Sequence, residues 1–195
     1  MANGPMTKES KSMNDPSRRI DRYGSLSIAL HWLMLVLIIG VYTCIDLVDF
    51  FAEGSNAEEF LKTWHFTLGL SILALVVLRV IVNVTSKVPE IQPVPPNWQK
   101  KAGNLMHLAL YALMFCMPVA GWLILSAEGT PIPFFGLHLP ALIGVNEGTA
   151  DLVQGFHETL GTLGYFLIGL HAVAGLFHHY VMRDTTLLRM LPERK

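Results

Sequence analysis

The stretch Asp151–Tyr180, DLVQGFHETLGTLGYFLIGLHAVAGLFHHY, is apolar enough to cross a lipid bilayer, yet it contains four histidines. An α-helix rises about 1.5 Å and turns about 100° per residue, so His157 and His171 lie on nearly the same face about 21 Å apart. His178 follows on that face after two further turns. Polar groups without partners are costly in hydrocarbon, so imidazoles at membrane depth indicate a functional site.

Gly161, Gly164 and Gly175 fall on the same stripe as these histidines and leave little side-chain bulk between them. A flat macrocycle fits against such a face, which favours two heme groups stacked across the membrane. The alternative is a small-residue helix-packing face, with the histidines hydrogen-bonded to neighbouring helices. Each histidine would then need its own polar partner inside the lipid, so the heme interpretation is preferred.

The composition is that of a membrane protein. Of 195 residues, 52% are hydrophobic and only 15% are charged, and the mean hydropathy is +0.44, well outside the usual range of soluble domains. The net charge of −1 and the lack of a basic cluster with interleaved aromatics argue against a nucleic-acid partner. Cys44 and Cys116 lie in apolar runs as small buried hydrophobes. No CxxCH motif occurs, so covalent heme attachment is not expected.

Four stretches reach the roughly 20 residues needed to span the hydrocarbon core. They are Leu26–Leu47, Trp64–Val84, Leu105–Ser126 and Leu152–Val181. The predicted fold is an all-α membrane protein, a four-helix transmembrane bundle binding two b hemes, in one domain over residues 22–195. Residues 1–21 are polar and lack the apolar core of a secretory signal, which predicts a disordered cytoplasmic tail. Pro118 is expected to kink the third helix.

The distribution of Lys and Arg predicts the orientation, because these residues are retained on the cytoplasmic side. The amino-terminal tail, the middle loop and the carboxyl tail contain Lys8, Lys11, Arg18, Arg19, Arg22, Lys87, Lys100, Lys101, Arg183, Arg189, Arg194 and Lys195. The other two loops contain only Lys62. Both termini are therefore predicted to be cytoplasmic.

The loops themselves differ in character. The middle loop, SKVPEIQPVPPNWQKK (residues 86–101), is proline-rich and is expected to be a stiff extended connection. The loop after the third span (residues 128–151) mixes Pro, Gly and aromatics. It is expected to lie in the outer interface, with Phe134, Phe135 and Leu137 entering the headgroup region.

Counting from the predicted helix ends gives each histidine a depth. Two imidazoles at one depth on facing helices can fill both axial positions of a heme iron. The outer pair is His65 with His157, and Gly69 lies one turn after His65 on its face. The inner pair is His31 with His171, with His178 as a rival partner about 10 Å deeper.

Arg79 is the only cation within a spanning stretch, on the face of His65 but at the inner level. Two interpretations stay open: it neutralises a propionate of the inner heme, or it extends to the nearby interface.

Hemes with histidine at both axial positions carry out electron transfer rather than ligand binding. The inner end of such a path needs an electron acceptor, and a lipid-soluble quinone is the natural one. Its carbonyl groups need hydrogen-bond donors, which His107 and His178 can supply, with Asn104 as a weaker candidate.

The segments SLSIALHWL, KTWHFTLGLSILALVVLRV, MHLALYALMFCMPVAGW and FHETLGTLGYFLIGLHAVAGLFHHY, followed by RDTTLLRMLP, resemble the bacterial cytochrome b561 family. The resemblance implies a bacterial inner-membrane protein with four helices and two b hemes, ligated by His31, His65, His157 and His171. It also implies a ubiquinone site near His107 and His178. Relatives of this size resemble superoxide oxidases, which pass an electron from superoxide at the periplasmic face to ubiquinone.

The outer loop DLVDFFAEGSNAEEFLK (residues 46–62) departs from that pattern, because it contains five carboxylates and one lysine. Such a surface repels an anionic radical instead of steering it. Three functions therefore stay open. They are a superoxide:ubiquinone oxidoreductase, an electron-transfer subunit for a separate dehydrogenase or hydrogenase, and a histidine-lined metal transporter, since imidazole also suits zinc, copper and nickel.

Overall fold

The computed structural model describes residues 21–192, so the predicted tail lies outside the described residues except for Asp21. The long helices are α1 (Ser25–Val48), α2 (Asn56–Thr85), α3 (Asn97–Glu128) and α4 (Glu147–Phe177). The shorter elements are strands β1 (Ile132–Phe134) and β2 (Leu137–Leu139), the π-helical turn η2 (His178–Met182) and the 3₁₀ turn η3 (Leu188–Met190).

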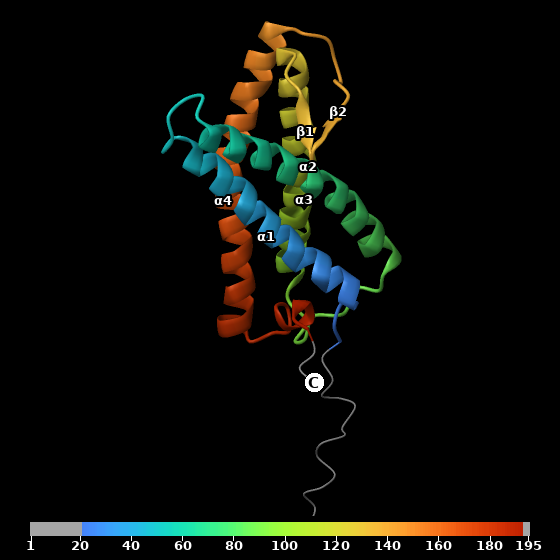
Figure 1. Ribbon diagram of the computed structural model, residues 1–195. Helices are drawn as coiled ribbons and strands as arrows, with labels where there is room; N and C mark the ends of the chain where they lie inside the picture. Colours follow the sequence, from blue (N-terminus) through green and yellow to red (C-terminus); the bar gives the residue numbers. More distant parts are fainter. Residues whose placement is uncertain (1–20, 193–195) are drawn as a thin grey trace, which may run out of the picture.

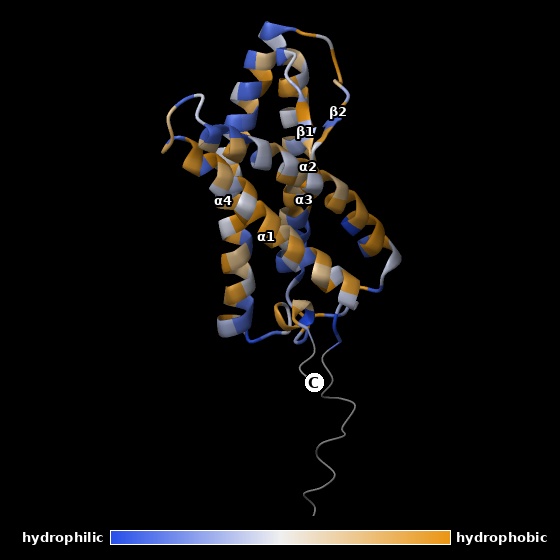
Figure 2. Ribbon diagram, in the orientation of Figure 1, coloured by the Kyte–Doolittle hydropathy of each residue, from blue (hydrophilic) through white to orange (hydrophobic). Residues whose placement is uncertain are grey.

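All four long helices are long and apolar enough to cross a membrane. Helices α1, α2 and α3 each contain one predicted span, and the fourth predicted span, Leu152–Val181, runs from α4 into η2. Hydrophobic residues recur along all four helices (Figure 2), and many of their large apolar side chains are exposed. The predicted four-helix transmembrane bundle is therefore confirmed.

The helices begin earlier than hydropathy alone predicts. Helix α3 starts at Asn97, directly after Pro96, so residues 97–101 of the middle loop are helical and the prediction of an extended chain there is wrong. Helix α4 starts at Glu147, where the Asn146 side chain accepts a hydrogen bond from the backbone N–H of Thr149. Hydropathy marks the part of a helix in lipid, whereas caps and prolines mark where its backbone begins.

The bundle consists of two helical hairpins that cross each other (Figure 1). Helix α1 packs along α2, α2 contacts α3, and α3 packs along α4. The backbone of α4 comes close to α3 but hardly to α1 or α2. The gap is therefore bridged mainly by side chains.

The connections divide between the two ends of the bundle. The described chain ends and the α2–α3 connection lie at one end, and the α1–α2 turn lies toward the other, with the segment that carries β1 and β2 (Figure 1). We refer to the end with the chain termini as the inner end and to the opposite end as the outer end.

The outer segment after α3 contains a β-hairpin that the sequence did not predict. Phe135 and Gly136 at its turn have φ angles of 48° and 79°, as in the two-residue turn that suits hairpins. Ile132 is buried, and Phe134 packs with it against Leu70 and Leu125, because alternate residues of a strand share a face. The expectation that Phe134 enters the headgroups is therefore wrong, whereas Phe135 is exposed.

Residues 183–192, the C-terminal clasp, fold back across the inner end. The backbone N–H of Tyr23 donates to the carbonyl of Arg189, and the indole N–H of Trp32 donates to the carbonyl of Met190 at 2.8 Å. The backbone N–H of Gln92 donates to the Thr185 hydroxyl at 2.9 Å. The clasp thus ties the start of α1 and the α2–α3 connection to the end of α4.

Two of the three α4 glycines that were expected to leave room for a flat macrocycle contact neighbouring helices instead. The Tyr42 hydroxyl of α1 donates to the carbonyl of Gly161 at 2.9 Å. A Cβ atom on Gly164 would collide with that hydroxyl and approach Leu113 at 3.2 Å. These two glycines therefore serve helix packing, as the alternative interpretation had it. Only Gly175 of the predicted stripe faces open space.

Because Tyr42 packs against Gly164, we expect a glycine-to-alanine substitution there, which normally stabilises a helix, to destabilise this protein. Gly to Ala within a helix normally stabilises by about 0.5–1 kcal/mol, but overpacking costs about 1–3 kcal/mol. We expect Gly164→Ala to lower the thermal unfolding midpoint of the purified protein. The control Gly155→Ala, which fills open space, should not lower it. Adding Tyr42→Phe to Gly164→Ala should recover stability; no recovery would contradict the packing explanation.

Candidate functional site

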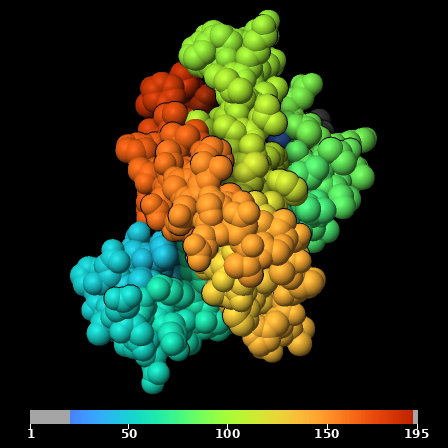
Figure 3. All heavy atoms as spheres, turned by 90° about the horizontal axis from the view of Figure 1, so that it is seen from above, coloured from blue at the N-terminus to red at the C-terminus, as the bar shows by residue number. Residues whose placement is uncertain are grey.

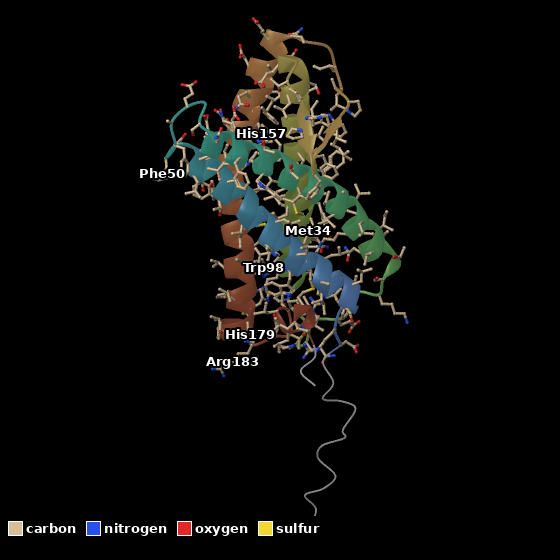
Figure 4. The ribbon with its side chains drawn as sticks, in the orientation of Figure 1. Met34, Phe50, Trp98, His157, His179 and Arg183 are labelled. Atoms are coloured by element: carbon tan, nitrogen blue, oxygen red, sulfur yellow. The ribbon has the colours of Figure 1, made fainter. Side chains whose placement is uncertain are left out.

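The first pair of histidines lies toward the outer end, where α2 faces α4. The ring centres of His65 and His157 are 6.2 Å apart, with an angle of 69° between the ring planes. Figure 4 labels His157 in the upper half of α4. His65 Nδ1 lies 3.1 Å from the carbonyl of Val41 on α1. A carbonyl can only accept, so Nδ1 holds the proton and the lone pair of Nε2 is free.

His157 is packed between α2 and α3. A Cβ atom on Gly121 of α3 would lie 3.6 Å from the His157 ring, so a glycine gives this imidazole its room. Among residues 21–192, His157 Nδ1 is buried and makes no hydrogen bond of good geometry, although the Met117 backbone lies near this imidazole. Buried polar atoms almost always have a partner, and an unpaired ring nitrogen in a lipid-spanning helix therefore points to a missing ligand or donor.

The second group of histidines lies toward the inner end. The ring centres of His31 on α1 and His171 on α4 are also 6.2 Å apart, with an angle of 68° between the planes. The His107 ring of α3 lies 5.4 Å from His171. Three helices thus place three imidazoles at one level of the bundle.

Arg79 of α2 points into this inner group. Its Nη2 lies 2.9 Å from His31 Nδ1, and its Nε donates to the Tyr111 hydroxyl at 3.3 Å. Arginine has no acceptor, so His31 Nδ1 is the acceptor here and the proton sits on Nε2. Arg79 Nη1 is buried and has no partner among residues 21–192. The guanidinium group therefore still has both N–H donors of Nη1 for an anion.

His178, at the end of α4, does not join either pair. Its Nδ1 lies 2.5 Å from a carboxylate oxygen of Asp184, which the sequence analysis did not single out. The only signal was an aspartate six residues after the histidine and just beyond the helix end. Figure 4 shows the neighbouring His179 and Arg183 at the inner end of the molecule.

The outer surface is acidic, although its carboxylates are not all free. Glu58 is buried, accepts from the backbone N–H of Gly54 and forms an ion pair with Lys62 at 2.6 Å. The Tyr165 hydroxyl of α4 contacts both carboxylate oxygens of Asp46. Asp49, Glu53 and Glu59 stay exposed. Seen from above, the α1–α2 turn forms a lobe of its own beside the α3–α4 segment (Figure 3).

The donor set of the bundle consists of paired imidazoles. Within residues 21–192, no group of three or more His, Cys, Asp or Glu side chains is placed to hold a metal ion. A bare zinc ion bound by a protein usually takes three or four side chains. Heme iron instead carries four ring nitrogens of its own and needs two axial ligands. The pairs therefore suit heme better than a bare metal ion.

Comparison with known proteins agrees with this chemistry. A family model described as prokaryotic cytochrome b561 matches residues 22–193. Cytochrome b561 homolog 1 of Escherichia coli (strain K12) is 35% identical over 176 residues, which cover 90% of this chain and 100% of that protein. Probable superoxide oxidase CybB of Yersinia pestis is 35% identical over 174 residues, 89% of this chain and 98% of that protein. Cytochrome b561 homolog 2 of Escherichia coli (strain K12) is 31% identical over 176 residues.

The family match and these relatives cover nearly the whole described bundle. The protein thus belongs to the prokaryotic cytochrome b561 family, and it is a multi-pass bacterial membrane protein that transfers electrons with b-type heme.

Proposed function

We propose that this protein carries electrons across the bacterial inner membrane from superoxide at the outer face to ubiquinone near the inner face, as a superoxide:ubiquinone oxidoreductase. The observation that carries the proposal is the presence of two imidazole pairs at two levels, each joining α4 to a helix of the other hairpin. Two such pairs provide for two hemes, one toward each side of the membrane.

The spacing of both pairs supports axial ligation. A metal–imidazole bond is about 2.0 Å long and the bound nitrogen lies about 1.1 Å from the ring centre, so two imidazoles on one metal have centres roughly 6 Å apart. Both observed separations are 6.2 Å. The backbones of α4 and the α1–α2 hairpin make few direct contacts, so both imidazole pairs lie where side chains, rather than packed backbones, connect the two hairpins.

At the outer position the ligands proposed are His65 and His157. The hydrogen bond from His65 Nδ1 to the Val41 carbonyl leaves Nε2 free and fixes the ring orientation, as in most metal-binding histidines. Gly69, on the same face of α2, has nothing within 4 Å of where a Cβ would lie. At this level, His65 thus has a free Nε2, and the helix face beside Gly69 has room for a flat group.

At the inner position the ligands proposed are His31 and His171. Ligation through His31 Nε2 requires the proton on that nitrogen to leave, and so Arg79 must give up Nδ1 as its acceptor. A heme propionate is an alternative partner for the guanidinium group, whose Nη1 is already unpaired. With heme bound at the inner position, Arg79 would therefore pair with a propionate carboxylate instead of with His31.

Iron with histidine at both axial positions supplies one-electron transfer. The residues at the inner end then have to bind the acceptor. His107 lies beside His171, and His178 lies two turns further toward the inner end on α4. We propose that these two side chains hold the ubiquinone head.

The proposed orientation places both termini in the cytoplasm. The inner end of the bundle contains Arg22, Lys87, Lys100, Lys101 and Arg183, and basic residues are retained on the cytoplasmic side. The acidic α1–α2 turn then faces the periplasm.

One observation favours a second function. The exposed carboxylates of the α1–α2 turn repel an anion such as superoxide but attract a basic patch on another protein. Such an acidic surface suits a non-catalytic electron-transfer subunit, because it can bind a basic patch on a separate dehydrogenase. The 35% identity with a probable superoxide oxidase over nearly its full length favours the first function.

Heme counting tests the outer position. We expect His65→Ala and His157→Ala each to reduce the heme content from two per chain to one, with low-spin absorption bands retained from the remaining heme. The control His138→Ala, at an exposed position of the hairpin, should keep both hemes. Two hemes in either outer-pair variant would overturn this assignment.

Substitution of Arg79 tests the inner position. A charged hydrogen bond contributes about 1.5–3 kcal/mol, so we expect Arg79→Gln to weaken binding of the inner heme by about tenfold or more. Heme titration of the depleted protein measures this. Binding at the outer position should stay the same, and equal weakening at both positions would speak for a general loss of fold.

The source of electrons distinguishes the superoxide:ubiquinone oxidoreductase from the electron-transfer subunit. Purified protein alone should reduce ubiquinone when superoxide is generated, and the rate should rise with ionic strength as salt screens the acidic turn. Neutralising Glu53 and Glu59 together should also raise it. Failure of the isolated, heme-loaded protein to reduce ubiquinone would reject the oxidoreductase and leave the subunit.

A further inference from the structure

The C-terminal clasp holds a buried carboxylate against His178. The Asp184 side chain is 3% exposed, and one of its oxygens lies 2.5 Å from His178 Nδ1. The other oxygen accepts from the backbone N–H of Thr186 at 2.8 Å. The backbone N–H of Asp184 also donates to the carbonyl of His178. The carboxylate and the imidazole are thus fixed relative to each other.

The charge of Asp184 follows from these contacts. Burial raises the pKa of its carboxyl group, but the hydrogen bonds from His178 and Thr186 together hold that pKa below its usual value. The group is therefore a carboxylate at neutral pH and can only accept. His178 Nδ1 consequently holds a proton.

The second ring nitrogen of His178 has a different environment. The His178 side chain is 19% exposed, and Nε2 is not among the atoms bound by the clasp. In the neutral ring Nε2 can only accept a hydrogen bond, whereas in the imidazolium form it donates one. A quinone oxygen, which only accepts, is therefore bound by the imidazolium form.

We propose that Asp184 is the positioning residue of a proton donor, and that His178, held and charge-balanced by Asp184, delivers a proton to the quinone. This rests on the proposed function, which places ubiquinone at the inner end. A carboxylate behind an imidazole fixes its orientation and stabilises the imidazolium. The Asp184–His178 pair thus supplies one of the protons that quinone reduction at the inner end requires.

The chemical balance is as follows. Reduction of one quinone to a quinol takes up two electrons and two protons. Under the proposed function two superoxide anions supply the electrons and become two dioxygen molecules. His178 loses its Nε2–H bond as an O–H bond forms at one quinone oxygen, and the neutral ring regains a proton from the inner aqueous phase. The same phase supplies the second proton.

The alternative role for Asp184 is structural, as an anchor of the clasp, and Thr185 provides a matched control. Its hydroxyl accepts from the backbone N–H of Gln92 and so ties the clasp to the α2–α3 connection, without contact to the His178 ring. If Asp184 were only an anchor, Asp184→Asn and Thr185→Val should behave alike.

The test uses the full-length, heme-loaded protein. General acid catalysis contributes about 100-fold or more, so we expect Asp184→Asn to lower kcat for ubiquinone reduction about 100-fold with both hemes retained. Asparagine can donate as well as accept, so ¹⁵N NMR of His178 should show a mixture of ring tautomers in place of the Nδ1–H form. Thr185→Val should change neither, and Asp184→Glu should restore part of the rate.

The outcomes separate this inference from the proposed function. A kcat of Asp184→Asn within twofold of the parent, or an equal loss in Thr185→Val, overturns the role of Asp184. If His178→Ala is slow while Asp184→Asn is not, the quinone placement stands and only this inference fails. If His178→Ala reduces ubiquinone at the parent rate, the placement of ubiquinone at His178 fails as well.

Discussion

Imidazole side chains within a hydrocarbon layer need polar partners, and the rest of this bundle follows from how that need is met. Water is absent at membrane depth, so each ring nitrogen must find an acceptor, a donor or a metal inside the protein. His65 contacts the Val41 carbonyl and His31 contacts Arg79, while His157 Nδ1 makes no hydrogen bond of good geometry within the described residues. The pairing of four imidazoles at two equal separations is the arrangement that heme iron satisfies.

The helix packing is adapted to this constraint. Each hairpin is held together by its own backbone contacts, and the two hairpins meet through α2 and α3. Helix α4 instead reaches α1 and α2 through particular side chains, with Tyr42 on the glycine backbone at mid-depth and an imidazole pair on each side of it. Close packing of α4 on all three partners would close the space that a flat cofactor needs. The glycines that pack against Tyr42 and Leu113 and the proposed heme ligands therefore occupy different levels of α4.

The two ends of the bundle have opposite electrostatic character and different construction. The outer end has an acidic turn and a short hairpin packed on α2 and α3. The inner end has basic residues and the C-terminal clasp, which buries Asp184 and Arg189. Under the proposed function, electron entry and electron exit therefore face different chemical environments. Within residues 21–192, a buried carboxylate bound to an imidazole occurs only at the inner end, which suits that end to chemistry that consumes protons.

The sequence by itself determined the class of fold and the residues worth examining. Four apolar stretches of about 20 residues predict four spanning helices, because a helix of this length crosses the hydrocarbon core and pairs its own backbone groups. Histidines within such stretches are costly enough to indicate function. The family resemblance could also be read from the helical segments alone. The loops were less predictable, since Phe135 adopts a positive φ that its residue type disfavours, and the hairpin depends on contacts with Leu70 and Leu125. Tertiary structure alone decided that Gly164 faces Tyr42, that Arg79 meets His31, and that Asp184 lies against His178. These contacts join residues on different helices or beyond a helix end, where helical periodicity carries no information about side-chain partners.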